Sequence, residues 1–234
     1  KISEKEINNR KDLRHLDSFT IDPDDAKDFD DALSIEKKDG FYNIGIHIAD
    51  VSHFFNNRTQ INNEAEKRAT SIYLVDRTIP MLPEKLSNNL CSLKPNVDRL
   101  TFSVLIKMDE KFKIISSWVG RTIIHSKKRF TYEDAQESID NSNGLFHEKL
   151  NMLNKVAKHI RKKRFDSGSF NFRSNEVKFK LDKEKKPIGV YKKVRKDTHK
   201  LVEEYMLLAN KIVAEFIINH EKKNNKTFHI IYKI

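Results

Sequence analysis

The stretch from Ala32 to Ile48 reads Ala-Leu-Ser-Ile-Glu-Lys-Lys-Asp-Gly-Phe-Tyr-Asn-Ile-Gly-Ile-His-Ile, and it sets the kind of fold that the chain can form. From Tyr42 to Ile48, every second residue is isoleucine or tyrosine, which is the period of a strand with one buried face. Asp39-Gly40 is a tight-turn pair that separates this stretch from the apolar run Ala32–Ile35. The sequence therefore predicts a β-hairpin.

Further strands and helices are expected around this hairpin. The expected strands are Phe19–Ile21, Ser71–Val75, Leu100–Lys107, Ile114–Ile124, Glu176–Leu181 and Ile188–Val194, with a last one beginning at Thr227–Ile234. The expected helices are Asn62–Thr70 with Asn62 as its cap, Thr131–Asp140, Gly144–Arg164 and Asp197–His220. Without a repeat or a linker-like composition, these elements predict one α+β domain at residues 18–234, entered by a polar arm at residues 1–17.

Positive charge is concentrated in one part of the chain. The whole sequence has 45 Lys and Arg against 34 Asp and Glu, a formal net charge of +11. The segment Met152–Lys200 alone has 17 basic and five acidic residues, a net charge of +12. Such a segment is typical of a protein that binds a polyanion, although a lysine-rich surface can also serve solubility alone. Aromatic residues within it could stack on unpaired bases, but each of them is more often a core residue.

The sequence argues against a membrane-spanning protein and leads us to expect a non-secreted one. The longest unbroken apolar run, Tyr205–Ala209, is far too short to span a membrane. The polar N-terminus has no apolar segment of a signal peptide. Cys91 is the only cysteine, so an internal disulfide cannot form, and a reducing cytoplasm is the expected location.

The residues between the first two expected strands are unusually acidic. Six of the ten residues from Asp22 to Asp31 are aspartate. Two such charges about 4 Å apart repel each other by roughly 4 kcal/mol at an effective dielectric constant near 20, so a loop fixed at both ends needs a reason to hold them. Hard carboxylate oxygens are the ligands that Mg²⁺ and Mn²⁺ prefer, and beside a basic segment such a site favours phosphate chemistry. An acidic surface loop stays open as an alternative, whereas a calcium loop of the EF-hand type would need glycine where Leu33 stands.

The acidic stretch and three later motifs, taken together, resemble a known family. Thr20-Ile21-Asp22-Pro23-Asp24-Asp25-Ala26-Lys27-Asp28-Phe29-Asp30-Asp31-Ala32 resembles the signature of the ribonuclease II and ribonuclease R catalytic (RNB) domain. The motifs that follow in the same order are His47-Ile48-Ala49-Asp50-Val51-Ser52-His53, Thr70-Ser71-Ile72-Tyr73 and the proline-containing stretch Ile79–Leu93. The resemblance covers nearly the whole chain and is closer to ribonuclease R.

The resemblance implies both an activity and a set of site residues. It implies a mixed, largely antiparallel sheet with packed helices. It also implies a processive 3′→5′ exoribonuclease that hydrolyses single-stranded RNA to 5′-mononucleotides with Mg²⁺, or Mn²⁺ in its place, as cofactor. The family's catalytic and metal-binding aspartates correspond to Asp22, Asp28, Asp30 and Asp31, its base-clamping residues to Tyr73 and Phe172 (or Phe170), and a further catalytic glutamate to Glu203. The family also leads us to expect cold-shock and S1 domains flanking this one in the parent protein, and a C-terminal part of the catalytic domain beyond residue 234.

Two other functions remain to be weighed against this one. The first is a catalytically silent RNA-binding module on the same fold, which the loss of an active-site aspartate would favour. The second is a phosphohydrolase acting on a small ester, which the long basic segment disfavours. His47, flanked by Ile46 and Ile48, is expected to be a hydrogen-bonded structural residue, and Cys91 a small buried one.

Overall fold

A computed structural model describes residues 2–170, 177–184, 186–192 and 194–224 of the chain. Its strands are β1 (Lys11–Asp12), β2 (Ser18–Asp22), β3 (Asp31–Lys38), β4 (Phe41–Ala49), β5 (Ile72–Tyr73), β6 (Thr78–Ile79), β7 (Asp98–Met108), β8 (Ile114–Thr131), β9 (Val177–Leu181) and β10 (Pro187–Lys192). Its helices are α1 (Glu4–Asn8), α2 (Gln60–Arg68), α3 (Tyr132–Asp140), α4 (His147–Asp166) and α5 (Asp197–Asn224), with a 3₁₀ turn η1 (Val51–His53) and a π-type turn η2 (Leu86–Leu90). The α+β fold class, with a largely antiparallel sheet, is confirmed.

The main sheet closes on itself through its longest strand. Its order is β1-β8-β2-β3-β4-β7, and β7 also pairs with β8. The first part of β8, up to His125, runs antiparallel to β7, and its last part, from Ser126 to Thr131, runs parallel to β2. One strand therefore joins the two ends of the sheet, and β2 comes to lie beside residues that are more than 100 positions away in the chain.

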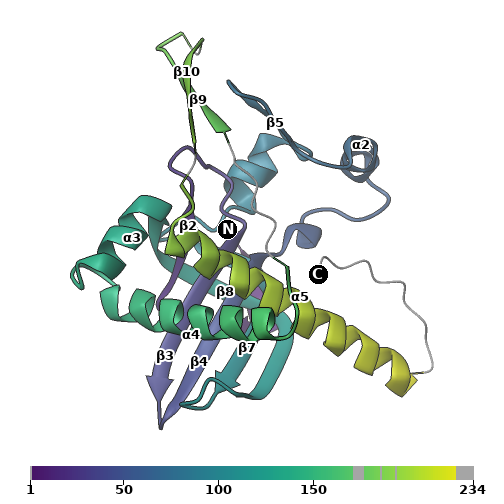
Figure 1. Cartoon of the computed structure of the whole chain (residues 1–234). Coiled ribbons are helices and arrows are strands. Elements are labelled where there is room, and N and C mark those ends of the chain that lie inside the picture. The colour runs from purple at the N-terminus through teal and green to yellow at the C-terminus, as the bar shows by residue number, and fades with distance from the viewer. Residues whose placement is uncertain (1, 171–176, 185, 193, 225–234) are drawn as a thin grey trace.

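The helices cover one face of this sheet. Figure 1 shows α4 and α5 crossing in front of β3, β4, β7 and β8, with α3 beside them. Alternate residues of the strands, such as Leu33, Ile44 and Ile46, are buried against Leu150 and Tyr205 of the helices. The apolar faces that the sequence predicts for the strands and for the helices thus pack against each other in one core, which is the main stabilising layer of the fold.

Most predicted elements are present, although several differ in their bounds. The β3–β4 hairpin pairs Asp31 with Ile48 and Lys38 with Phe41, as its alternation predicts. Helix α2 begins about one turn earlier than expected, because its cap is Thr59 and not Asn62. The Thr59 hydroxyl accepts the Asn62 backbone N–H at 3.3 Å. The strand expected at Ser71–Val75 is reduced to Ile72–Tyr73, and the one expected at Thr227–Ile234 lies outside the described residues.

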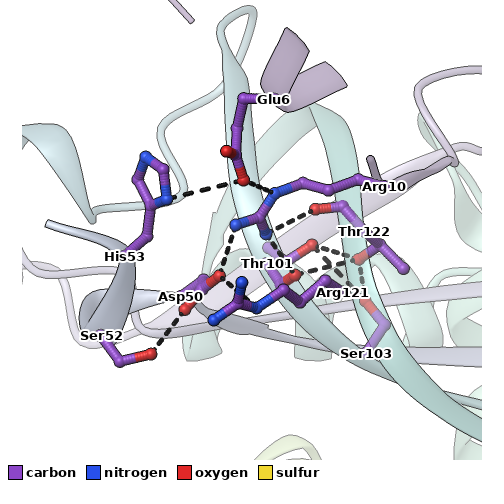
Figure 2. Close-up of polar contacts among 9 residues, drawn as sticks. All are labelled: Glu6, Arg10, Asp50, Ser52, His53, Thr101, Ser103, Arg121 and Thr122. Atoms are coloured by element: carbon purple, nitrogen blue, oxygen red, sulfur yellow. Dashed lines mark hydrogen bonds and ion pairs between the residues drawn. The ribbon is translucent and has the colours of Figure 1, made fainter. Parts of the chain in front are cut away.

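The N-terminal residues are attached to the sheet. β1 pairs in parallel with β8, opposite Thr122 and Ile123. Figure 2 shows the adjoining network, in which the buried Arg10 guanidinium donates to Glu6 at 2.6 Å, to Asp50 at 2.7 Å and to the backbone carbonyl of Thr101 at 3.2 Å. The sequence predicts an entering arm at residues 1–17, and part of this arm packs against the sheet.

A chain of buried hydroxyls continues from this network into the sheet. Thr122, Ser103 and His47 are linked by contacts of 2.5 Å between the two hydroxyls and 2.8 Å between Ser103 Oγ and His47 Nδ1. The other ring nitrogen of His47 lies 2.9 Å from Ser34 Oγ, and burial lowers the pKa of His47 to about 3. The prediction that His47 is a hydrogen-bonded structural histidine is confirmed, as is the burial of Cys91.

Two small hairpins stand apart from the main sheet. β5–β6 and β9–β10 are separate two-stranded sheets, and Figure 1 places both beyond the end of the main sheet at which the β2–β3 connection lies. Among the described residues, no helix is long and apolar enough to cross a bilayer.

Candidate active site

The acidic loop between β2 and β3 is anchored to the interior of the protein by one apolar side chain. Phe29, between Asp28 and Asp30, is 9% exposed and packs in a second apolar cluster with Leu86, Cys91 and Leu93. Its backbone is also tied down, because its N–H donates to Ser92 Oγ at 3.0 Å and its carbonyl accepts the Leu93 N–H at 2.8 Å. Phe29 therefore anchors the otherwise largely exposed loop to the core, next to Asp28 and Asp30.

The loop opens on a pocket of about 760 Å³. Three segments that are distant in the sequence contribute to its walls: the acidic loop, the β5–β6 hairpin and the β9–β10 hairpin. Its lining consists of Asp22, Pro23, Asp25, Ala26, Asp28, Asp30, Asp31, Tyr73, Leu74, Val75, Thr78, Val177, Lys178, Phe179, Leu181 and Tyr191. The four aspartates and the tyrosine named from the sequence thus share one pocket.

Burial, together with neighbouring carboxylates, raises the pKa values of Asp22, Asp30 and Asp31 in the pocket. Burial, with smaller contributions from Asp30 and Asp28, raises the pKa of Asp22 to about 6. Burial and the charges of Asp22 and Asp30 raise the pKa of Asp31 to about 7. Although much of Asp30 is open to solvent, the surrounding protein lowers its hydration, and this effect together with Asp28 raises its pKa. These shifts mark a site where negative charge is held without enough positive charge to balance it.

The donor atoms suit a hard divalent cation. Asp22 Oδ2 is buried and has no partner within hydrogen-bond geometry among the described residues, although Thr20 lies close enough to favour the charged carboxylate. In the described part of the chain, no three Asp, Glu, His or Cys side chains are arranged closely enough to enclose a metal ion. Mg²⁺ is usually held by one or two carboxylates together with water and substrate phosphates. The residues therefore fit an ion for which a bound substrate supplies some of the ligands.

Aromatic side chains stand at the mouth of the pocket. Tyr73 is 69% exposed, and its hydroxyl donates to Asp28 Oδ2 at 3.4 Å, although the two residues are 45 positions apart. Phe179 and Tyr191, which on sequence grounds are more often core residues, are instead about half exposed and line the same pocket. Phe172 lies outside the described residues, and the alternative, Phe170, is 85% exposed.

Tyr132 is a neighbour of the aspartates that the sequence did not reveal. Burial, followed by the charges of Asp31 and Asp22, raises the pKa of Tyr132 to about 12. Its ring stacks on His199 of α5 with the centroids 4.0 Å apart. The only sequence signal was its position at the start of the helix expected at Thr131–Asp140, which indicates secondary structure and not a site.

The Glu203-Glu204 pair divides into two roles. Glu204 is fully buried and receives hydrogen bonds from Arg161 at 2.8 Å and Arg164 at 2.6 Å. Glu203 is partly exposed, pairs with Arg195 and lies 3.9 Å from Arg161. Glu203 is not among the residues that line the aspartate pocket, and none of its contacts in the described residues reaches the aspartates. Part of the basic segment is therefore used inside the protein and is not free for a polyanion.

Comparison with known proteins identifies relatives over nearly the whole chain. The family profile described as the RNB domain matches residues 10–233. The chain is 43% identical to the human exosome complex exonuclease RRP44 over 94% of this chain and 23% of that protein. It is also 39% identical to the inactive exonuclease DIS3L2 of Arabidopsis thaliana, over 92% of this chain and 22% of that protein.

The fold has a close counterpart among solved structures. Mycoplasma genitalium RNase R, in complex with ribose-methylated single-stranded RNA, superposes with a TM-score of 0.89 at 29% sequence identity. The match covers 94% of this chain and 36% of that one. The chain therefore spans between about a fifth and about a third of the length of these relatives.

Proposed function

Because the chain belongs to the RNB-domain family of exoribonucleases, we propose that it hydrolyses single-stranded RNA processively from the 3′ end and releases 5′-mononucleotides. The observation that carries the proposal is the shared pocket of Asp22, Asp28, Asp30, Asp31 and Tyr73. A cluster of carboxylates with raised pKa values next to an exposed aromatic ring suits a phosphodiester whose terminal base needs a stacking partner.

The side chains have distinct tasks in this proposal. Asp22, Asp28, Asp30 and Asp31 would hold Mg²⁺, or Mn²⁺ in its place, and the bound ion would polarise the scissile phosphate and activate water. Tyr73, together with Phe172, would stack on the last base, which fixes the strand end without reading its sequence. Glu203 keeps its proposed catalytic role on the resemblance alone.

The wider setting belongs to the same proposal. The catalytic domain would extend from residue 18 beyond residue 234, after an entering arm at residues 1–17. Cold-shock and S1 domains would flank it in the whole protein, which would act in the cytoplasm. The RNA held by the related Mycoplasma structure supports single-stranded RNA as the partner.

End-labelled RNA tests the proposal directly. A 3′→5′ exonuclease releases a labelled mononucleotide at once from 3′-labelled RNA, and shortens 5′-labelled RNA stepwise without early release of its label. Both reactions should require Mg²⁺ or Mn²⁺ and stop with chelator. Early release of the 5′ label, or internal fragments from both substrates, would contradict the proposed direction of cleavage.

A catalytically silent RNA-binding module is the second candidate. The inactive Arabidopsis relative favours it, since it matches this chain at 39% identity. Retention of all four pocket aspartates argues for the enzyme instead. Binding of labelled RNA without any product, with the metal present and in the full-length protein, would decide for the silent module.

A further inference from the structure

The acidic loop is held at two points by side chains from other parts of the chain. On its first half, Arg129 Nη2 donates to the backbone carbonyls of Pro23 at 2.5 Å and Asp24 at 2.8 Å. On its second half, Ser92 Oγ donates to the Lys27 carbonyl at 2.9 Å and accepts the Phe29 N–H at 3.0 Å. The two contacts bracket the segment that carries Asp24, Asp25 and Asp28.

The two points of attachment are themselves connected. The Arg129 guanidinium lies over the ring of Phe29, with 5.6 Å between its central carbon and the ring centroid. Arg129 is placed there by the sheet, because it pairs with Thr20 where the end of β8 runs parallel to β2. Its side chain is only 21% exposed, and its Nε is buried without a partner among the described residues.

We propose that Arg129 and Ser92 are positioning residues, which together hold the acidic loop in the shape that binds the divalent cation. This inference rests on the proposed function and assigns the loop geometry to two residues outside the loop. Residues that orient metal ligands without touching the metal typically change metal affinity or activity by about 10- to 100-fold when they are replaced.

Whether replacement of Arg129 weakens or tightens cation binding distinguishes a positioning role from a purely electrostatic one. Arg129 carries a positive charge close to the carboxylates, and its Nη1 lies 3.8 Å from Asp24 Oδ1. If it acted only as a charge, its removal would make the pocket more negative and would tighten cation binding. If it holds the loop, its removal weakens cation binding even though the pocket becomes more negative.

Mn²⁺ binding to the whole chain, followed by the electron paramagnetic resonance signal of the free ion, measures this without any RNA. We expect Arg129→Ala to weaken Mn²⁺ binding by about tenfold or more and Ser92→Ala by several-fold. Arg129→Lys keeps the charge but lacks the planar fork, so it should fall between the wild type and Arg129→Ala. Lys128→Ala is the matched control, since it removes the neighbouring exposed charge, whose ammonium lies 5.8 Å from the Phe130 ring centroid.

The outcomes distinguish this inference from the function on which it rests. Unchanged or tighter Mn²⁺ binding in Arg129→Ala would overturn the positioning role and leave the metal site intact. A wild-type chain that binds no Mn²⁺ would overturn the metal site and the positioning role with it. If Arg129→Ala fails to show the cooperative melting of the wild type, Arg129→Lys and Ser92→Ala replace it, and wild-type affinity in both would equally overturn the inference.

Discussion

Asp22 and Asp50 are both almost completely buried, at 8% and 4% exposure, yet their charges have opposite surroundings. Burial would raise the pKa of Asp50, but hydrogen bonds from Arg10 and Ser52 outweigh it, and its pKa is lowered. Burial raises the pKa of Asp22 to about 6, and no arginine bonds to its buried oxygen. At similar burial, Asp50 has cationic partners that stabilise its charge, whereas the unbalanced charge of Asp22 supports its proposed role as a metal ligand.

The two regions also differ in where their partners come from. The Asp50 network in Figure 2 contains its own cations, Arg10 and the more distant Arg121, whose Nε lies 3.8 Å from Asp50. In the acidic pocket, the only described cationic lining residue is Lys178, on a separate hairpin. The nearby Arg129 lowers the pKa of Asp22 only in part, so a further positive partner is expected for the pocket, and the contrast can be tested by experiment.

The largest effect is expected on catalysis at Asp30. Asp30→Asn keeps the size of the side chain and removes one charge from the pocket, so cleavage should fall by about 10²- to 10⁴-fold. RNA binding should stay near normal, because it depends mainly on Lys and Arg contacts to phosphates. Filter binding and single-turnover cleavage of one labelled RNA by the full-length protein measure both quantities.

Asp24→Asn is the matched control for Asp30, since it makes the same change in the same loop at a side chain that is 91% exposed. Cleavage by this control should stay within a few-fold of the wild type. If Asp30→Asn also cleaves within a few-fold, Asp30 is not part of the active site.

The same substitution should change stability in opposite directions at the two buried aspartates. Asp50→Asn leaves Arg10 without its full partner charge, and loss of one member of a buried pair costs about 3–5 kcal/mol. Asp22→Asn removes an unbalanced charge and should raise the free energy of unfolding by roughly 1–3 kcal/mol at pH 7 without metal, since one pKa unit is about 1.4 kcal/mol. Urea unfolding in the presence of chelator measures both changes.

The pH dependence of this gain provides an internal check. In the folded protein, Asp22 takes up a proton as the pH falls through about 6, above the ordinary value of 3.8, so its unfavourable charge disappears. The advantage of Asp22→Asn should therefore shrink as the pH falls from about 6 toward 4. An advantage that stays constant over this range would mean that the charge of Asp22 is not its cause.

Divalent metal should stabilise the protein by a moderate amount. An ion that binds only the folded state adds about 2.7 kcal/mol at a concentration a hundredfold above its Kd. Thermal melts in Mg²⁺ or Mn²⁺ against chelator should show a higher melting temperature for the wild type and for Asp50→Asn. Asp22→Asn should lose most of this increase, and an unchanged melting temperature for the wild type over millimolar metal would argue against a preformed site.

The smallest effect is expected at Tyr73, which adds an aromatic surface beside the charges. Base stacking is worth roughly 1–3 kcal/mol per base, so Tyr73→Ala should weaken the binding of short oligonucleotides more than that of long ones. Long strands keep their backbone contacts elsewhere. Titration of oligonucleotides of increasing length measures the trend, and an equal loss at every length would indicate that Tyr73 has only a structural role.

Local patterns predicted most of the fold. The alternation around Ile44 and Ile46 and the Asp39-Gly40 turn are short-range signals, and the hairpin they predict is present, with Asp39-Gly40 between its strands. The error at Asn62 arose because Thr59 and Asn62 are both good caps, and the choice between them depends on the preceding loop. β8 continues seven residues past the expected end at Ile124, because pairing with distant β2 stabilises its polar last part.

The candidate site could be predicted only where its residues lie close together in the sequence. Six aspartates in ten residues indicated a metal site, although an acidic surface loop stayed open as an alternative until the family motifs were considered. Arg129 and Ser92 give no such signal, since each lies more than 60 positions from the loop residue that it contacts. Glu203 and Glu204 are adjacent and chemically identical, so only packing against Arg161 and Arg164 shows that Glu204 is the buried one.

The pairing of β2 with the end of β8 has a consequence for biosynthesis. Asp22 lies opposite Thr131, which is 109 positions further along the chain. At about 5–20 residues per second, a ribosome needs roughly 5–20 s to make the intervening chain. During that time one edge of β2, directly before the acidic loop, has no strand to pair with, and unpaired strand edges attract other chains. We expect the repulsion among the crowded aspartates to discourage two such exposed edges from joining before β8 is made.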